Sequence, residues 1–139
     1  TIPIWEERVR IAEINGLEPL VESTIERWFT AEFRSQNEIL VDRFRKSIRN
    51  TSIAGYTGCC RAIQTFDTSK RLAEVNLPTL IMVGEEDTGT RVFEHEVIHA
   101  GIKDSKLIVF PHAAHLSNIG AEIAFNTELL TFLDGQGKD

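Results

Sequence analysis

Two short apolar segments rich in β-branched residues, at positions 77–84 and 106–110, constrain the fold of this chain more than any other feature. Each is too short to form a stable helix, so each is predicted to be a buried strand. Between them, apolar residues recur at the spacing of one helix face across positions 92–102. Strands joined through a helix in this way are normally parallel. The sequence therefore predicts a βαβ unit.

One acid and one histidine follow the two predicted strands. Asp87 comes after the first strand and His115 after the second. Because the carboxyl ends of parallel strands lie on the same edge of a sheet, where ligands bind, we expect these side chains to meet. A buried carboxylate can hold an imidazole in one tautomer while the other ring nitrogen moves a proton. The alternative is a capping Asp and a surface His on unrelated loops.

The order of this pair, acid before His, is that of the Ser-His-Asp triads of α/β-hydrolases. The nucleophile of such a triad is missing, because no Gly-x-Ser-x-Gly motif occurs in the 139 residues. Two parallel strands alone would also leave both outer sheet edges unpaired. The missing serine and the missing strands both indicate part of a larger fold. A partner chain or a second copy of this chain would also complete the sheet.

Composition narrows the classes of partner. The formal net charge is −6 and 26% of residues are charged, without a basic cluster, so we expect neither nucleic acid nor an anionic membrane as a partner. The apolar runs are far shorter than a membrane span, and no secretory signal is visible. The two adjacent cysteines, Cys59 and Cys60, do not form a disulfide framework. These features favour a cytoplasmic protein.

The first half of the sequence is predicted to be helical. Helices are expected up to Ile14, from Pro19 to Phe29, and over residues 38–49 and 53–65, and residues 30–37 are expected to be a polar break. In the third helix, the apolar pattern predicts an inward face formed by four residues, Ile39, Leu40, Phe44 and Ile48.

Several motifs together resemble a known family. They lie at residues 26–30 (Glu-Arg-Trp-Phe-Thr), 55–63 (Gly-Tyr-x-Gly-Cys-Cys-x-Ala-Ile), 84–87 (Gly-x-x-Asp) and 113–118 (Ala-Ala-His-Leu-Ser-Asn). With these motifs, the chain resembles the C-terminal half of an α/β-hydrolase, most of all the 3-oxoadipate enol-lactonases. One departure concerns the loop after the acid: family members commonly carry a proline there, whereas this chain reads Asp-Thr-Gly-Thr from Asp87.

The resemblance implies an α/β-hydrolase fold of which only the C-terminal portion is present, with a helical cap followed by two parallel strands and flanking helices. The cap would span residues 1–66 and the core residues 67–139. By the same resemblance, Asp87 would be the triad acid and His115 the general base. A cation of the cap would position the carboxylate of the substrate, with Arg27 and Arg34 as candidates and Trp28 as an apolar wall.

The implied reaction is hydrolysis of 3-oxoadipate enol-lactone to 3-oxoadipate, in the bacterial catabolism of aromatic compounds through the β-ketoadipate pathway. A serine upstream of this chain would attack the lactone carbonyl, so the isolated chain is expected to be inactive. The resemblance implies no metal and no organic cofactor.

Two further hypotheses belong to other classes. Residues 95–99 read His-Glu-Val-Ile-His, which matches the zinc-protease signature His-Glu-x-x-His. On a helix, His95 and His99 would share one face, with Glu96 as the base and Glu122 as a conceivable third ligand. Against this, the motif is short, and its metzincin extension fails at Ile102 and Ser105. The last hypothesis is a non-catalytic binding or interaction domain that retains the Asp-His pair by descent.

Overall fold

The computed structural model describes residues 2–136, and these divide into two compact units. The first unit contains the residues up to Glu26 together with Arg34–Asp67, and the second contains Arg27–Phe33 together with the chain from Thr68 onward. The short segment Arg27–Phe33 thus packs with the C-terminal unit although helical residues of the first unit flank it. No helix in the described part of the chain combines the length and the apolar character needed to cross a bilayer.

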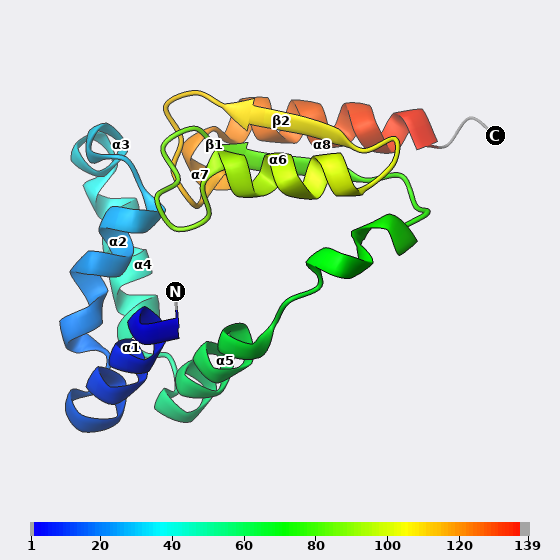
Figure 1. The fold of residues 1–139 in the computed structure, drawn as a ribbon. Helices are drawn as coiled ribbons and strands as arrows, with labels where there is room; N and C mark the ends of the chain where they lie inside the picture. The colour runs from blue at the N-terminus through cyan, green and yellow to red at the C-terminus, as the bar shows by residue number, and fades with distance from the viewer. Residues whose placement is uncertain (1, 137–139) are drawn as a thin grey trace. The chain divides into compact units, whose positions relative to one another are not determined.

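The second unit is built on the predicted βαβ arrangement. Strand β1 (Leu80–Gly84) pairs in parallel with β2 (Lys106–Phe110), in a register that places Gly84 opposite Phe110. Helix α6 (Val92–Gly101) connects them and packs against both strands (Figure 1). The β-branched and aliphatic residues of the two strands form this ladder because their side chains suit a pleated surface buried by helices. The βαβ prediction is confirmed, but the expectation that both strands are buried is wrong for β2, where Phe110 is buried whereas Val109 is 39% exposed.

Two shorter elements and one long helix flank the two strands in this unit. The 3-10 helix η2 (Ser69–Glu74) precedes β1, and α7 (Ser117–Gly120) and α8 (Glu122–Gln136) follow β2. Helix α8 contacts β1, and its Phe125 packs 5.7 Å from Phe110 between ring centroids. Not every apolar residue is covered: on α6, Phe93 and Val97 remain 55% and 56% exposed, so the predicted apolar face of this helix is only partly buried.

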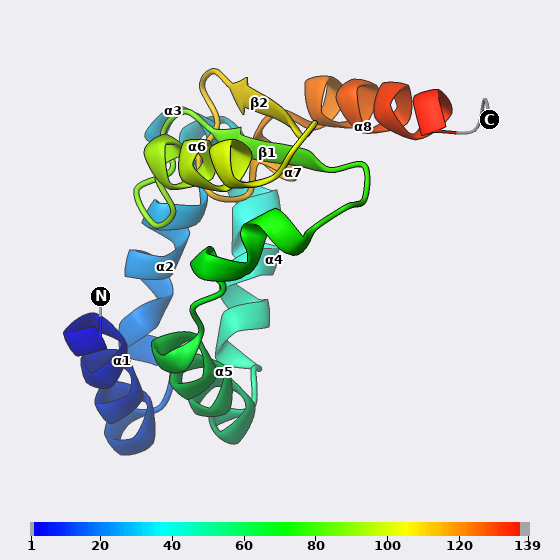
Figure 2. The ribbon, with the colours of Figure 1, turned by 45° about the vertical axis from the view of Figure 1, so that its right-hand side comes forward.

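The first unit is helical, as the sequence predicts. Helix α1 (Ile2–Asn15) packs along α5 (Ile53–Thr65), as Figure 2 shows, and the 3-10 turn η1 (Glu18–Leu20) leads into α2 (Val21–Trp28). Helix α5 begins after a capping serine, where the hydroxyl of Ser52 accepts a hydrogen bond from the Gly55 backbone N–H.

Two predictions for the N-terminal half of the sequence are wrong. Residues 30–37 are not simply a polar break, because they contain helix α3 (Ala31–Gln36). The Thr30 hydroxyl accepts a hydrogen bond from the Phe33 N–H at 3.2 Å and so caps this short helix. In α4 (Glu38–Arg49), Ile39 is 81% exposed and Val41 is fully buried instead.

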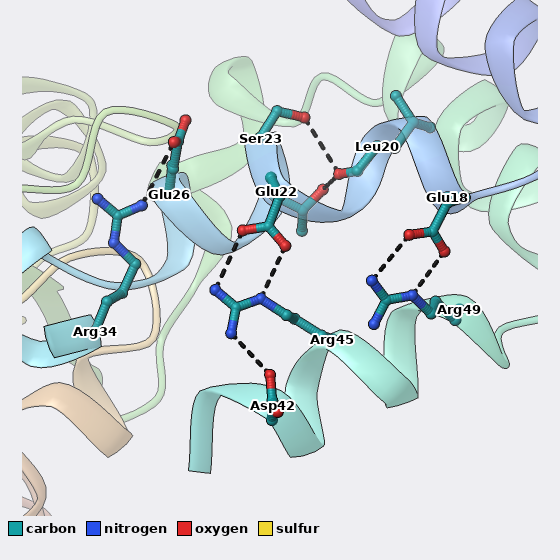
Figure 3. Close-up of polar contacts among 10 residues, drawn as sticks. Glu18, Leu20, Glu22, Ser23, Glu26, Arg34, Asp42, Arg45 and Arg49 are labelled. Atoms are coloured by element: carbon teal, nitrogen blue, oxygen red, sulfur yellow. Dashed lines mark hydrogen bonds and ion pairs between the residues drawn. The ribbon is translucent and has the colours of Figure 1, made fainter. Parts of the chain in front are cut away.

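Charged side chains link α4 to the preceding helices (Figure 3). Arg49 makes a two-point ion pair with Glu18, and Arg45 makes one with Glu22 while also bonding Asp42. Each pair is at least partly exposed to solvent, so each contributes little to stability by itself. The fork geometry of arginine nevertheless fixes the register between η1–α2 and α4.

Candidate active site

Asp87 and His115 lie together at the carboxyl ends of the two parallel strands. The Asp87 Oδ2 atom accepts a hydrogen bond from His115 Nδ1 at 2.8 Å. The Asp87 side chain is 3% exposed, whereas that of His115 is 36% exposed. The expected proximity of the two side chains is therefore confirmed, and the alternative of unrelated loops is wrong.

Gly84 allows the two loops to meet. The chain after β2 crosses directly over Gly84, so a Cβ at this position would collide with the carbonyl oxygens of Ala113 and Ala114. Two backbone hydrogen bonds hold the crossing in place, from Glu85 N–H to Phe110 O and from Glu86 N–H to Ala113 O, each at 2.9 Å. The glycine of the Gly-x-x-Asp motif thus brings His115 within reach of Asp87 because it carries no side chain.

Four hydrogen bonds surround the Asp87 carboxylate. Oδ1 accepts from the backbone N–H groups of Gly89 (2.7 Å) and Thr90 (3.0 Å), and Oδ2 accepts from the Thr90 hydroxyl (2.9 Å) and from His115. Burial raises the pKa of Asp87, but the hydrogen bonds from Thr90, His115 and Gly89 together outweigh burial and lower the pKa below its ordinary value. The carboxylate is therefore ionised at neutral pH.

Because the Asp87 carboxylate is ionised, the tautomer of the His115 ring can be inferred. A carboxylate can only accept hydrogen bonds, so the 2.8 Å contact requires the proton of His115 to sit on Nδ1 when the ring is neutral. Nε2, on the other side of the ring, is then left with its lone pair. An imidazole held in this tautomer by a buried carboxylate can accept a proton at Nε2, and the carboxylate stabilises the resulting cation.

The segment Arg27–Phe33 contacts both loops of this site. The Leu116 N–H, next to His115, donates to the Trp28 carbonyl at 3.1 Å. On the other loop, a Cβ built on Gly89 would lie 2.9 Å from Cδ of Arg27, so the aliphatic stem of this arginine covers the acid loop. Two of the three predicted substrate-binding residues, Arg27 and Trp28, therefore belong to the same unit as the Asp-His pair, and both are partly buried.

The third predicted substrate residue lies in the first unit. Arg34, on α3, is 3.7 Å from the Glu26 carboxylate, within that unit (Figure 3). Nothing in the sequence pattern indicates this pairing, because Glu26 and Arg34 are on different helices.

The zinc-protease motif lies on α6, as expected, but each histidine has another contact. His95 Nδ1 is 3.0 Å from the Arg91 carbonyl, and His99 Nδ1 is 2.8 Å from the Ser105 hydroxyl. Across residues 2–136, no group of three or more His, Cys, Asp or Glu side chains is arranged to hold a metal ion. The predicted third ligand, Glu122, does not join the two histidines.

Sequence reasoning missed a buried arginine in the first unit. Arg8 is 9% exposed and donates from Nε to the Tyr56 hydroxyl and from Nη2 to the Thr24 hydroxyl, each at 2.7 Å. Among the residues that the structure describes, no carboxylate pairs with it. The only sequence signal is a charged residue within the predicted first helix, and a charge there is normally solvated. Arg8 joins α1, α2 and α5, and burial raises the pKa of its partner Tyr56.

The fold of this chain is similar to those of solved hydrolase structures. The folded chain superposes on an enol-lactonase from Burkholderia xenovorans with a TM-score of 0.92 at 24% identity, covering 95% of this chain and 50% of that one. A hydrolase from Pseudomonas aeruginosa matches with a TM-score of 0.89 at 30% identity and the same coverage. This chain has the fold of the C-terminal portion of an α/β-hydrolase.

Sequence comparison supports the same family. 3-Oxoadipate enol-lactonase 1 of Acinetobacter baylyi is 36% identical over 115 residues, which are 83% of this chain and 43% of that enzyme. 3-Oxoadipate enol-lactonase 2 of the same organism is 30% identical over 122 residues, 88% of this chain and 45% of that enzyme. The α/β-hydrolase portion described here thus spans a little under half the length of these curated relatives. No family profile matches the chain.

Proposed function

We propose that this chain supplies the acid and the general base of a serine hydrolase that opens a lactone or a small ester. The observation that carries the proposal is the 2.8 Å hydrogen bond from His115 Nδ1 to the buried Asp87 carboxylate at the carboxyl edge of two parallel strands. Similarity to two curated 3-oxoadipate enol-lactonases supports 3-oxoadipate enol-lactone as the substrate.

In the proposed mechanism, Asp87 and His115 activate a serine contributed by the preceding part of an α/β-hydrolase fold. His115 Nε2 accepts the serine proton as Oγ attacks the lactone carbonyl, and Asp87 stabilises the imidazolium. The ring C–O bond then breaks, and His115 returns the proton to the leaving enol oxygen. A water molecule deprotonated by His115 next attacks the acyl-enzyme, which releases the free carboxylic acid and regenerates the serine. The reaction as proposed uses no cofactor.

The same proposal gives the substrate carboxylate a cationic partner. Arg27 is the best-supported candidate, because its stem lies against Gly89, two residues from Asp87, and Trp28 follows it in the segment bound to the His115 loop. Arg34 is retained as a second candidate, although Glu26 lies 3.7 Å from it. Arg27→Ala is expected to raise KM far more than it lowers kcat, since it would act in binding rather than in proton transfer.

The isolated chain is proposed to be inactive, because its 139 residues contain no Gly-x-Ser-x-Gly nucleophile motif. Further strands would then pair with the sheet, from the rest of a longer polypeptide, a partner chain or a second copy. The experiment compares the purified 139-residue chain with the polypeptide as the source cells make it, assayed for enol-lactone opening. The proposal expects activity in the longer or complexed form and none in the isolated chain.

Variants of the active form separate this proposal from the non-catalytic alternative. His115→Ala is expected to reduce kcat by about 10⁶-fold and Asp87→Ala by about 10⁴-fold. His112→Ala, an exposed histidine on the same loop, is the matched control and is expected to retain activity. Turnover that survives His115→Ala would remove this residue from the mechanism, and the complete absence of hydrolase activity in the native form would favour a binding or interaction domain.

A further inference from the structure

Thr90 contacts both members of the Asp-His pair, although the sequence motifs do not single it out. Its hydroxyl donates to Asp87 Oδ2 at 2.9 Å, and its backbone N–H donates to Oδ1 at 3.0 Å. The same hydroxyl oxygen lies 3.5 Å from His115 Nδ1. Thr90 therefore lies directly beside the hydrogen bond that joins the acid to the imidazole.

The Thr90 hydroxyl helps to orient the Asp87 carboxylate, because the last side-chain torsion of an aspartate rotates easily. Rotation about the last side-chain bond of an aspartate is broad and is not fixed by staggered wells. Hydrogen bonds must therefore set the plane of the Asp87 carboxylate. Two backbone N–H groups hold Oδ1, whereas Oδ2 has only the Thr90 hydroxyl to hold it toward His115. Since the Asp87 side chain is 3% exposed, water cannot readily replace this hydroxyl.

We propose that Thr90 is a positioning residue: its hydroxyl holds Asp87 Oδ2 toward His115 Nδ1 and thereby keeps the imidazole in the tautomer that leaves Nε2 free to accept a proton. This inference rests on the proposed function for its catalytic meaning. The positioning itself is a property of the loop and can be measured without turnover. It also gives a role to the loop Asp-Thr-Gly-Thr, in which the chain departs from the proline commonly found in the family.

A purely structural role for Thr90 makes a different prediction. If the residue served only to shape the turn, its backbone N–H and its β-branched form would be enough. Thr90→Val keeps both and removes the hydroxyl, whereas Thr90→Ser keeps the hydroxyl and removes the methyl group. Thr88→Val makes the same chemical change in the same loop, at an exposed threonine that forms no hydrogen bond within the described residues.

The experiment measures the His115 tautomer by ¹⁵N–¹H long-range NMR spectroscopy of the labelled 139-residue chain, with the signals assigned by comparison with His115→Gln. The parent chain, Thr90→Ser and Thr88→Val are expected to show the Nδ1–H tautomer. Thr90→Val is expected to increase the population of the Nε2–H tautomer by roughly tenfold or more, because a hydrogen bond to a charged group is lost. If Thr90→Val does not fold, as judged from its amide spectrum, Thr90→Ala is measured in its place.

Each outcome decides the proposal. A folded Thr90→Val or Thr90→Ala chain with the parent tautomer would overturn it, as would a Thr90→Ser chain that behaves like Thr90→Val. In the native active form, Thr90→Val is expected to lower kcat about tenfold with little change in KM, since Thr90 does not touch the substrate. If the tautomer depends on Thr90 but turnover survives His115→Ala, the proposed function fails and the positioning role stands.

Discussion

Replacing Gly84 by alanine tests how the two loops of the site are brought together. The added Cβ would collide with the carbonyl oxygens of Ala113 and Ala114, and neither atom belongs to a flexible side chain that could rotate away. Relief requires the backbone before His115 to move, which also weakens the Glu86 N–H bond to Ala113 O. Overpacking of this kind generally costs about 1–3 kcal/mol, and because the clash here is with backbone atoms we expect Gly84→Ala to lower the free energy of unfolding by about 3 kcal/mol.

The assay is urea unfolding followed by the fluorescence of Trp28, with Trp5 replaced by phenylalanine so that the signal comes from the C-terminal unit. Gly135→Ala is the matched control, because a Cβ at this helical position has open space around it. Alanine also has the better helix propensity, so the control is expected to be neutral or to stabilise by about 0.5 kcal/mol. A loss below about 0.5 kcal/mol for Gly84→Ala would refute the argument that the close backbone crossing requires glycine.

Two further predictions concern the acid loop. Gly89→Ala is expected to lower the free energy of unfolding by roughly 1 kcal/mol, because its Cβ would lie 2.9 Å from Cδ of Arg27. In a double-mutant cycle, Arg27→Ala should restore most of this loss, and additive effects of the two substitutions would contradict the packing of Arg27 on Gly89. Asp87 has a pKa below its ordinary value, so its ionised form stabilises the fold above the pKa of the unfolded chain, and this stability is lost as the pH falls through the folded-state pKa. Urea unfolding in acid should therefore show a steeper loss for the parent chain than for Asp87→Asn, and equal slopes would argue against the hydrogen-bonded carboxylate.

The sequence predicts the site to the extent that periodicity and topology determine it. The β-branched runs define two strands, the intervening helix makes them parallel, and parallel strands bring Asp87 and His115 to one edge. The contacts that complete the site do not follow from local pattern. The Thr90 hydroxyl donates to the Asp87 carboxylate, and the Trp28 carbonyl accepts from the Leu116 N–H. Neither contact can be read from the spacing of residues in the sequence.

The errors in the N-terminal half of the sequence have a similar origin. Most residues after Phe29 are polar, but the hydroxyl of Thr30 caps a short helix there, and the rings of Phe29 and Phe33 stack with their centroids 5.0 Å apart. In α4, both Ile39 and Val41 are apolar, but they are two positions apart and therefore point about 200° away from each other around a helix. Only one of them can face the neighbouring helices. The partner elements decide that Val41 is buried and Ile39 is not.

The most direct test of the Asp87–His115 account is labelling of the native active polypeptide with a fluorophosphonate, which reacts with a serine only when a neighbouring base activates it. The account predicts that the native form is labelled, that His112→Ala is labelled equally, and that His115→Ala loses labelling by several orders of magnitude. Undiminished labelling of a folded His115→Ala variant would show that another residue activates the nucleophile and would contradict the account.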